Sequence, residues 1–282
     1  MPSFQTANRA KANLDHIYTE PDPRAYFTTL VEHDYSIPDE ARPVFAKLIE
    51  ARAALSELPV TMVDVGCSYG VNAALQHDDL SFAALADRWS RPELADLERD
   101  ELLEVDREFF ANLPTTHKLR VVGVDSSAAA LDYATEAGLL AHGIARNLEE
   151  EALSPEDRDA LSDCDIITST GAVGYVGPKT FDKLIGATAG DAPWLANFVL
   201  RMFSFDDVAD GLESLGYETR KLEGRTFPQR RFLSGEERDG ALETLHGMDV
   251  DTNGKEDAGH YHAELFISWK RGEPAPPLTF EN

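Results

Sequence analysis

Buried-strand segments alternate with amphipathic helices along most of this chain. Short runs rich in β-branched and other apolar residues predict strands, and they lie at 60–64, 119–125, 165–171 and 193–202. Between such runs, apolar residues recur three and four positions apart, as in the helix predicted from 204 to 216. A short strand before Ile144 and two late strands, at 217–222 and 263–269, bring the predicted total to seven. Strands that alternate with helices are typical of a parallel α/β sheet.

Two helical segments interrupt this alternation. Residues 1–59 precede the sheet, and their pattern predicts helices at 7–18, 24–31 and 43–58. A second helical segment, 76–118, separates the first helix of the sheet from its second strand. We therefore expect an N-terminal helical arm at 1–59, a sheet domain at 60–271 with the helical insert 76–118, and a C-terminal tail at 272–282.

The first strand runs into a glycine turn that indicates a nucleotide site. Asp64 ends the strand, Gly66 and Gly70 bound the turn, and an alanine-rich helix follows. Strand, glycine turn and helix form the first βα unit of a nucleotide-binding sheet, in which backbone N–H groups approach the ligand. A dinucleotide fingerprint would require glycine at Val71, and a P-loop would require a lysine near the turn. Neither is present.

The remaining pattern, Asp64-x-Gly66-x-x-x-Gly70, resembles motif I of the class I S-adenosylmethionine (SAM) methyltransferases. The chain departs from that motif at Ser68, where the family usually has a glycine. A second strand ends in Asp125, as expected for an acid that binds ribose hydroxyls. The helical insert explains why this acid follows the glycine turn at more than the usual ~20 residues. The resemblance predicts a Rossmann-like, seven-stranded class I methyltransferase sheet with an N-terminal helical lid.

The same resemblance assigns SAM-binding roles to residues at the strand ends. Asn147 would meet adenine, although it also suits a simple turn, and Arg24 would pair with the methionine carboxylate. The complete predicted set is Asp64, Gly66, Cys67, Ser68, Gly70, Asp125, Ser126, Asn147, Leu148, Thr170, Gly171 and Arg24.

Three tyrosines are the candidate catalytic residues. Tyr175 follows the fourth strand, whose end faces the reacting centre in the family, and Tyr18 and Tyr26 lie in the arm that commonly covers the site. Aromatic faces attract a sulfonium through cation–π interaction. Each tyrosine also suits ordinary packing. The sequence does not single out a general base among Tyr175, His33 and the carboxylates.

The composition of the chain argues against several classes of binding partner. The net charge is −25, with 51 acidic and 26 basic residues, and such a field repels nucleic acids and anionic membranes. No apolar run is long enough to span a membrane and no signal peptide is evident, which predicts a cytoplasmic protein. Two cysteines form no ligand set, and the calcium-like segment 249–254 has His260 where glutamate is needed, so we expect no metal.

The sequence therefore predicts an enzyme that transfers a methyl group from SAM to a small-molecule acceptor. A second, weaker resemblance, to the methyltransferase-like azetidine-2-carboxylate synthases, implies a different reaction. In that reaction SAM alone is the substrate, and its own amine displaces methylthioadenosine. A third possibility is a SAM-binding protein without turnover.

Overall fold

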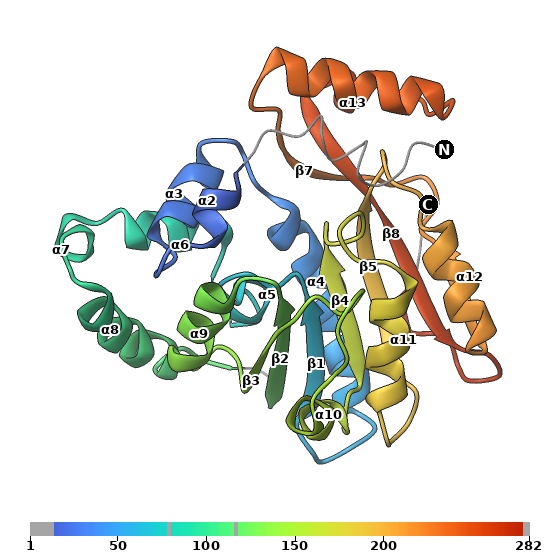
Figure 1. Cartoon of the computed structure of the whole chain (residues 1–282), viewed down its shortest axis with the longest axis horizontal. Coiled ribbons are helices and arrows are strands. Elements are labelled where there is room, and N and C mark those ends of the chain that lie inside the picture. The colour runs from blue at the N-terminus through green and yellow to red at the C-terminus, as the bar shows by residue number, and fades with distance from the viewer. Residues whose placement is uncertain (1–13, 78–79, 116–117, 279–282) are drawn as a thin grey trace.

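The computed structural model describes residues 14–77, 80–115 and 118–278, and they form a mixed α/β structure around one central sheet (Figure 1). The sheet has eight strands, seven of them in the order β3-β2-β1-β4-β5-β8-β6, and β7 pairs with β8. The strands are β1 (Val60–Val65), β2 (Leu119–Asp125), β3 (His142–Ala145), β4 (Ile166–Thr170), β5 (Trp194–Leu200), β6 (Tyr217–Lys221), β7 (Phe227–Arg231) and β8 (His260–Lys270). Strands β1 to β5 are parallel, whereas β8 runs antiparallel to its neighbours β5, β6 and β7.

Helices cover both faces and one end of the sheet. The arm forms α2 (Asp15–Tyr18), α3 (Arg24–Val31) and α4 (Ile37–Ala53), and Figure 1 shows α4 behind the strands, with α10 and α11 in front. Helix α4 contacts β1, β4 and β7. The other helices are α5 (Val71–Ala74), α6 (Phe82–Trp89), α7 (Pro92–Ala95), α8 (Arg99–Ala111), α9 (Ala128–Glu136), α10 (Pro155–Leu161), α11 (Pro178–Ala187), α12 (Asp206–Ser214), α13 (Gly235–Gly247) and the short 3-10 helix η1 (Glu256–Ala258). None of the helices that the structure describes is long and apolar enough to cross a bilayer.

The predicted Rossmann-like sheet is confirmed, and the structure adds one strand to it. Strand β7 (Phe227–Arg231) was missed because Pro228 and the three polar residues after it do not resemble a strand. The pairing of β7 with β8 shifts register between Pro228 and Arg230, which accommodates the proline. On its other side, β7 is held by the end of the arm: Ser36 N–H donates to the Gln229 carbonyl at 2.8 Å, and Arg231 N–H donates to the His33 carbonyl at 2.8 Å.

The third helix of the arm begins earlier than predicted. The sequence placed its start at Pro43, from the amphipathic pattern of the residues that follow. Instead the helix starts at Ile37 with Pro38 in its first turn, and Pro43 lies inside it. The helix ends at Ala53 rather than at Leu58. The first predicted helix, 7–18, falls mostly outside the described residues; its end is α2.

The arm and the insert pack against each other. Phe27 on α3 stacks on Phe82 and contacts Trp89, both on α6, with ring centroids 4.6 and 4.4 Å away. Beneath them, the buried carboxylate of Asp106 on α8 accepts hydrogen bonds from Arg88 and Trp89 on α6 and from Tyr133 on α9. The two helical segments that the sequence placed apart therefore form one layer beside the parallel strands.

Candidate functional site

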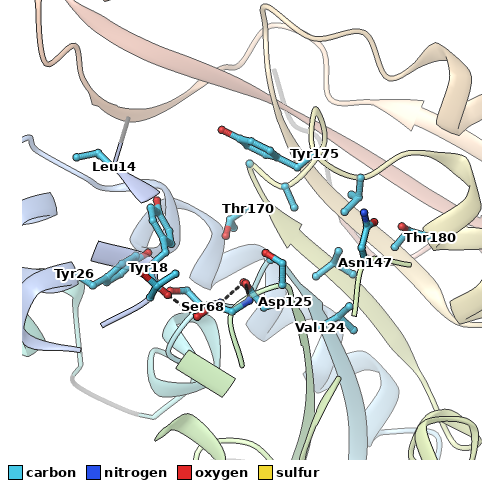
Figure 2. Close-up of a pocket in the computed structure, with 18 of the residues that line it drawn as sticks. Leu14, Tyr18, Tyr26, Ser68, Val124, Asp125, Asn147, Thr170, Tyr175 and Thr180 are labelled. Carbon is cyan, nitrogen blue, oxygen red and sulfur yellow. Dashed lines mark hydrogen bonds between the residues drawn. The ribbon is translucent and has the colours of Figure 1, made fainter. Parts of the chain in front are cut away.

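A cavity of about 520 Å³ lies at the carboxyl ends of the parallel strands (Figure 2). Its lining includes Gly66 after β1, Asp125 at the end of β2, Asn147 after β3 and Gly171 after β4. The arm supplies Tyr18, Tyr26 and Tyr35, while β7 supplies Gln229 and Arg230. This size and this position are typical of small-molecule sites in open α/β sheets.

Most of the residues predicted from the sequence come together in this cavity. Those that line it are Tyr18, Tyr26, Gly66, Ser68, Asp125, Ser126, Asn147, Leu148, Thr170, Gly171 and Tyr175. Four do not: Arg24, Asp64, Cys67 and Gly70. His33, considered as a base, is also absent from the lining.

Asp125 is the acidic group of the cavity floor. Its Oδ2 accepts a hydrogen bond from Ser68 N–H, and its Oδ1 accepts one from Ser127 N–H, both at 2.9 Å. Burial raises the pKa of this carboxyl, although the two N–H donors oppose that effect. A carboxylate has about four lone-pair sites, so two donors fix its orientation and leave each oxygen able to accept from a ligand. The geometry suits a ligand with two adjacent hydroxyls.

The glycine turn brings backbone close to the ligand space. Gly66 has a φ of 74°, and a Cβ there would lie 2.8 Å from the Cβ of Ala172 after β4. A side chain at position 66 would therefore push the loops after β1 and β4 apart. Gly70 also has a φ of 74°, but a Cβ there would meet Ala134 and Leu139. Its role is therefore in packing α5 against α9, outside the cavity.

Asn147 both lines the cavity and forms part of a turn. Its side chain lines the cavity, and its Oδ1 accepts a hydrogen bond from Glu149 N–H at 3.1 Å, as in a turn. Glu149 in turn accepts hydrogen bonds from Gly177 N–H, Thr180 N–H and the Thr180 hydroxyl, at 2.9, 2.9 and 2.6 Å. The loop after β3 is thereby fastened to the start of α11.

The tyrosines reach the cavity from two sides. Tyr18 and Tyr26 come from the arm and pack edge to face at 5.2 Å, whereas Tyr175 reaches in from the loop after β4 (Figure 2). Tyr35, a further tyrosine of the arm that was not assigned to the site, joins this group, and its hydroxyl is hydrogen-bonded to that of Tyr26. Burial raises the pKa of Tyr35 to about 12, and it also raises the pKa values of Tyr18 and Tyr26 well above the usual tyrosine value. The three arm tyrosines are therefore neutral phenols near pH 7.

The expected role of Arg24 does not fit its position. Its guanidinium pairs with Asp22 at 2.8 Å and donates to the carbonyls of Leu94, Ala95 and Leu97. All of these partners lie outside the cavity, and three of them belong to the insert. Arg24 therefore ties the arm to the insert.

Asp64 and Cys67 support the glycine turn from behind. Asp64 is fully buried and accepts hydrogen bonds from Asn72 and Thr168. Burial without a cationic partner raises its pKa to about 7. Cys67 is also buried, and burial raises the pKa of its thiol. Neither side chain lines the cavity, so the structure does not bring these two predicted residues to the ligand space.

Sequence reasoning missed the contribution of β7 because it did not predict that strand. Arg230 is buried, and its guanidinium forms two hydrogen bonds with Glu237, at 2.6 and 3.0 Å, so its charge is compensated. The Gln229 amide lies against Gly171, where an added Cβ would be 2.9 Å from its Nε2. Together they place a neutral polar wall opposite the parallel strands.

No family model matches the sequence, and no curated protein matches it in sequence. Solved structures of similar shape include the plantazolicin methyltransferase BpumL, 12% identical over 95% of this chain and 98% of that one, with a TM-score of 0.40. Precorrin-6y C5,15-methyltransferase from Geobacter metallireducens is 12% identical over 82% and 87%, with a TM-score of 0.39. Magnesium protoporphyrin IX methyltransferase from Synechocystis, solved with SAM, is 10% identical over 81% and 78%, with a TM-score of 0.38. Similarity at this level assigns no activity to this chain, so the functional argument rests on the cavity.

Proposed function

We propose that this chain binds SAM in the cavity and transfers its methyl group to a small-molecule acceptor. The observation that carries the proposal is that the glycine turn after β1 and the acid after β2 open into one cavity, with Asp125 held in place by Ser68 N–H and Ser127 N–H. A ribose offers two adjacent hydroxyls to such a carboxylate.

The groups of SAM would lie along the strand ends in the order of the strands in the sheet. Asn147 and Leu148 follow β3, at one end of the parallel strands, and would meet adenine. Asp125 ends β2 and would hold the ribose. The sulfonium would then lie near the loops after β1 and β4, between the arm tyrosines and Tyr175. Aromatic faces attract a cation, and Tyr175 would do so from an exposed position, since it is 64% exposed.

The arm would serve as the lid of this site. The Ser127 hydroxyl donates to the Tyr18 carbonyl at 2.6 Å, and the Tyr69 hydroxyl donates to the Glu20 carbonyl at 2.8 Å. Both donors belong to the loops that would hold SAM, so the lid and the SAM site share their supports. A closed lid excludes water from the sulfonium and aligns the acceptor with the S–CH₃ bond. In the transfer step the acceptor's lone pair bonds to the methyl carbon as the C–S bond breaks, leaving S-adenosylhomocysteine.

Asp125→Asn tests the assignment of the ribose. The variant keeps the size of the side chain and one acceptor oxygen, but it loses the charge and one of the two acceptors. We expect it to weaken SAM binding by about 2 kcal/mol, or roughly 30-fold, as for hydrogen bonds to a charged group. Isothermal titration calorimetry measures this loss.

Asp132→Asn is the matched control, because Asp132 is an exposed residue of α9 outside the cavity. It should bind SAM like the wild type. Wild-type affinity in folded Asp125→Asn would place the ribose elsewhere.

Product analysis separates methyl transfer from the other two functions. Pure protein is incubated with SAM, with and without a mixture of candidate small-molecule acceptors, and the nucleoside products are identified by mass spectrometry. S-adenosylhomocysteine that forms only with an acceptor supports methyl transfer. Methylthioadenosine formed from SAM alone would instead indicate intramolecular cyclisation, and bound but unchanged SAM would indicate a binding protein.

A further inference from the structure

A series of hydrogen bonds between buried side chains runs from β1 to the cavity. Asp64, next to last in β1, is 0% exposed, and both of its carboxylate oxygens accept from Asn72 Nδ2, at 3.0 and 3.1 Å. Asn72 lies on α5 and is 2% exposed. The same Nδ2 donates to the hydroxyl oxygen of Thr170 at 3.1 Å. Thr170 ends β4 and lines the cavity, so this series of hydrogen bonds connects an unexposed carboxylate to the surface that a ligand would contact.

Asn72 is the donor in both hydrogen bonds, to Asp64 and to Thr170. An amide nitrogen carries two hydrogens, and here one faces Asp64 while the other faces Thr170. The Asn72 amide nitrogen lies 3.0 to 3.1 Å from both Asp64 oxygens and from the Thr170 hydroxyl oxygen, while the Asn72 oxygen has no hydrogen-bond partner among the described residues. The Thr170 hydroxyl oxygen thus accepts a hydrogen bond from Asn72, and the hydroxyl hydrogen points away from Asn72.

We propose that Asp64 and Asn72 are positioning residues that hold the Thr170 hydroxyl as a donor to the carboxylate of the amino-acid end of SAM. This inference rests on the proposed function. Asp125 on β2 would hold the ribose, and Thr170 lies two strands away across β1, at about 10 Å for a strand spacing of about 4.8 Å. The amino-acid end of SAM extends from the ribose in this direction if adenine lies over β3. A hydroxyl whose oxygen already accepts a hydrogen bond is suited to donate to a carboxylate.

Two observations on these hydrogen-bonded residues support a role in positioning. Asp64 has no cationic partner among the described residues, so it is not half of a salt bridge. Asn72 donates to both neighbours while its own oxygen has no hydrogen-bond partner, which is a costly arrangement for a buried amide. An apolar side chain in place of Asn72 would avoid that cost. Thr170, which accepts from Asn72, lines the cavity, whereas Thr168, which also donates to Asp64, does not.

The test is a double-mutant cycle between positions 72 and 170, read by calorimetric binding of SAM and of decarboxylated SAM. The second ligand lacks only the carboxylate. Thr170→Val is isosteric and should weaken SAM binding at least tenfold while leaving the affinity for decarboxylated SAM unchanged. Thr170→Ser keeps the hydroxyl and should retain most of the affinity for SAM.

Asn72→Leu should weaken SAM binding threefold or more in the wild-type background, and should cause no further loss in the Thr170→Val background. If Asn72→Leu does not fold, Asp64→Asn takes its place in the cycle with the same expectation. Additive losses, or equal losses for SAM and decarboxylated SAM, would overturn the inference while leaving SAM binding intact. A wild-type protein that binds neither ligand would instead overturn the proposed function on which the inference rests.

Discussion

Replacing Asp106 with alanine is expected to lower the free energy of unfolding by about 3–5 kcal/mol, the range for breaking a buried ion pair from one side. Asp106 is 0% exposed, and its carboxylate accepts from Arg88 at 2.6 Å, Trp89 at 2.7 Å and Tyr133 at 2.7 Å. Alanine would leave all three donors without this acceptor, and the Arg88 guanidinium is only 11% exposed. Urea denaturation followed by circular dichroism measures the loss.

Asp87→Ala is the matched control for this loss. Asp87 pairs with Arg91 on the surface at 3.4 Å and its side chain is 76% exposed, so its removal should cost no more than about 0.5 kcal/mol. An Asp106 variant as stable as the Asp87 variant would mean that the insert does not depend on this buried carboxylate.

Asp64→Asn is expected to change how stability varies with pH. Burial raises the pKa of Asp64 from 3.8 to about 7, so the folded state holds a proton that the unfolded state has released over this interval. The contribution of Asp64 to stability is therefore present below the unfolded pKa and is lost as the pH rises through the folded one. Between about pH 5 and about pH 8 the wild type should lose about 3 kcal/mol relative to Asp64→Asn.

Urea unfolding of both proteins at several pH values in this interval measures that difference, and groups shared by the two proteins largely cancel. Parallel curves would show that Asp64 is ionised throughout the interval. The sign of the change in stability with pH also distinguishes Asp64 from Asp157. The pKa of Asp157 is lowered to about 2 by its partners His142, Ser154 and Arg146, against the effect of burial. A carboxyl of that kind loses its stabilising contribution only in acid.

The sheet could be read from the sequence because each of its central strands is buried on both faces. Strand β2 (Leu119–Asp125) has the predicted bounds, and α3 (Arg24–Val31) matches its predicted helix. Strand β7 could not be recognised, since its pairing depends on β8, which is distant in sequence, and on the arm. Local propensity argued against a strand that contains Pro228.

The site was predictable where a residue's role follows from its place at a strand end. Asp125 and Gly66 lie in the cavity because the carboxyl ends of parallel strands meet at one edge of the sheet. Arg24 lies outside the cavity because its partners are carbonyls of the insert, and backbone partners leave no signal in the sequence. Tyr35 and Gln229 were missed because only the pairing of the arm with β7 brings them to the cavity.

The account depends above all on the identity of the ligand, and titration calorimetry of the wild-type protein with SAM, S-adenosylhomocysteine and NAD tests it most directly. We predict saturable binding of SAM and S-adenosylhomocysteine at one site per chain, because both carry the adenine, ribose and amino-acid groups that the strand ends would hold. We predict no binding of NAD, because Val71 stands where a dinucleotide turn requires glycine. Binding of NAD together with no heat from either SAM compound would contradict the account.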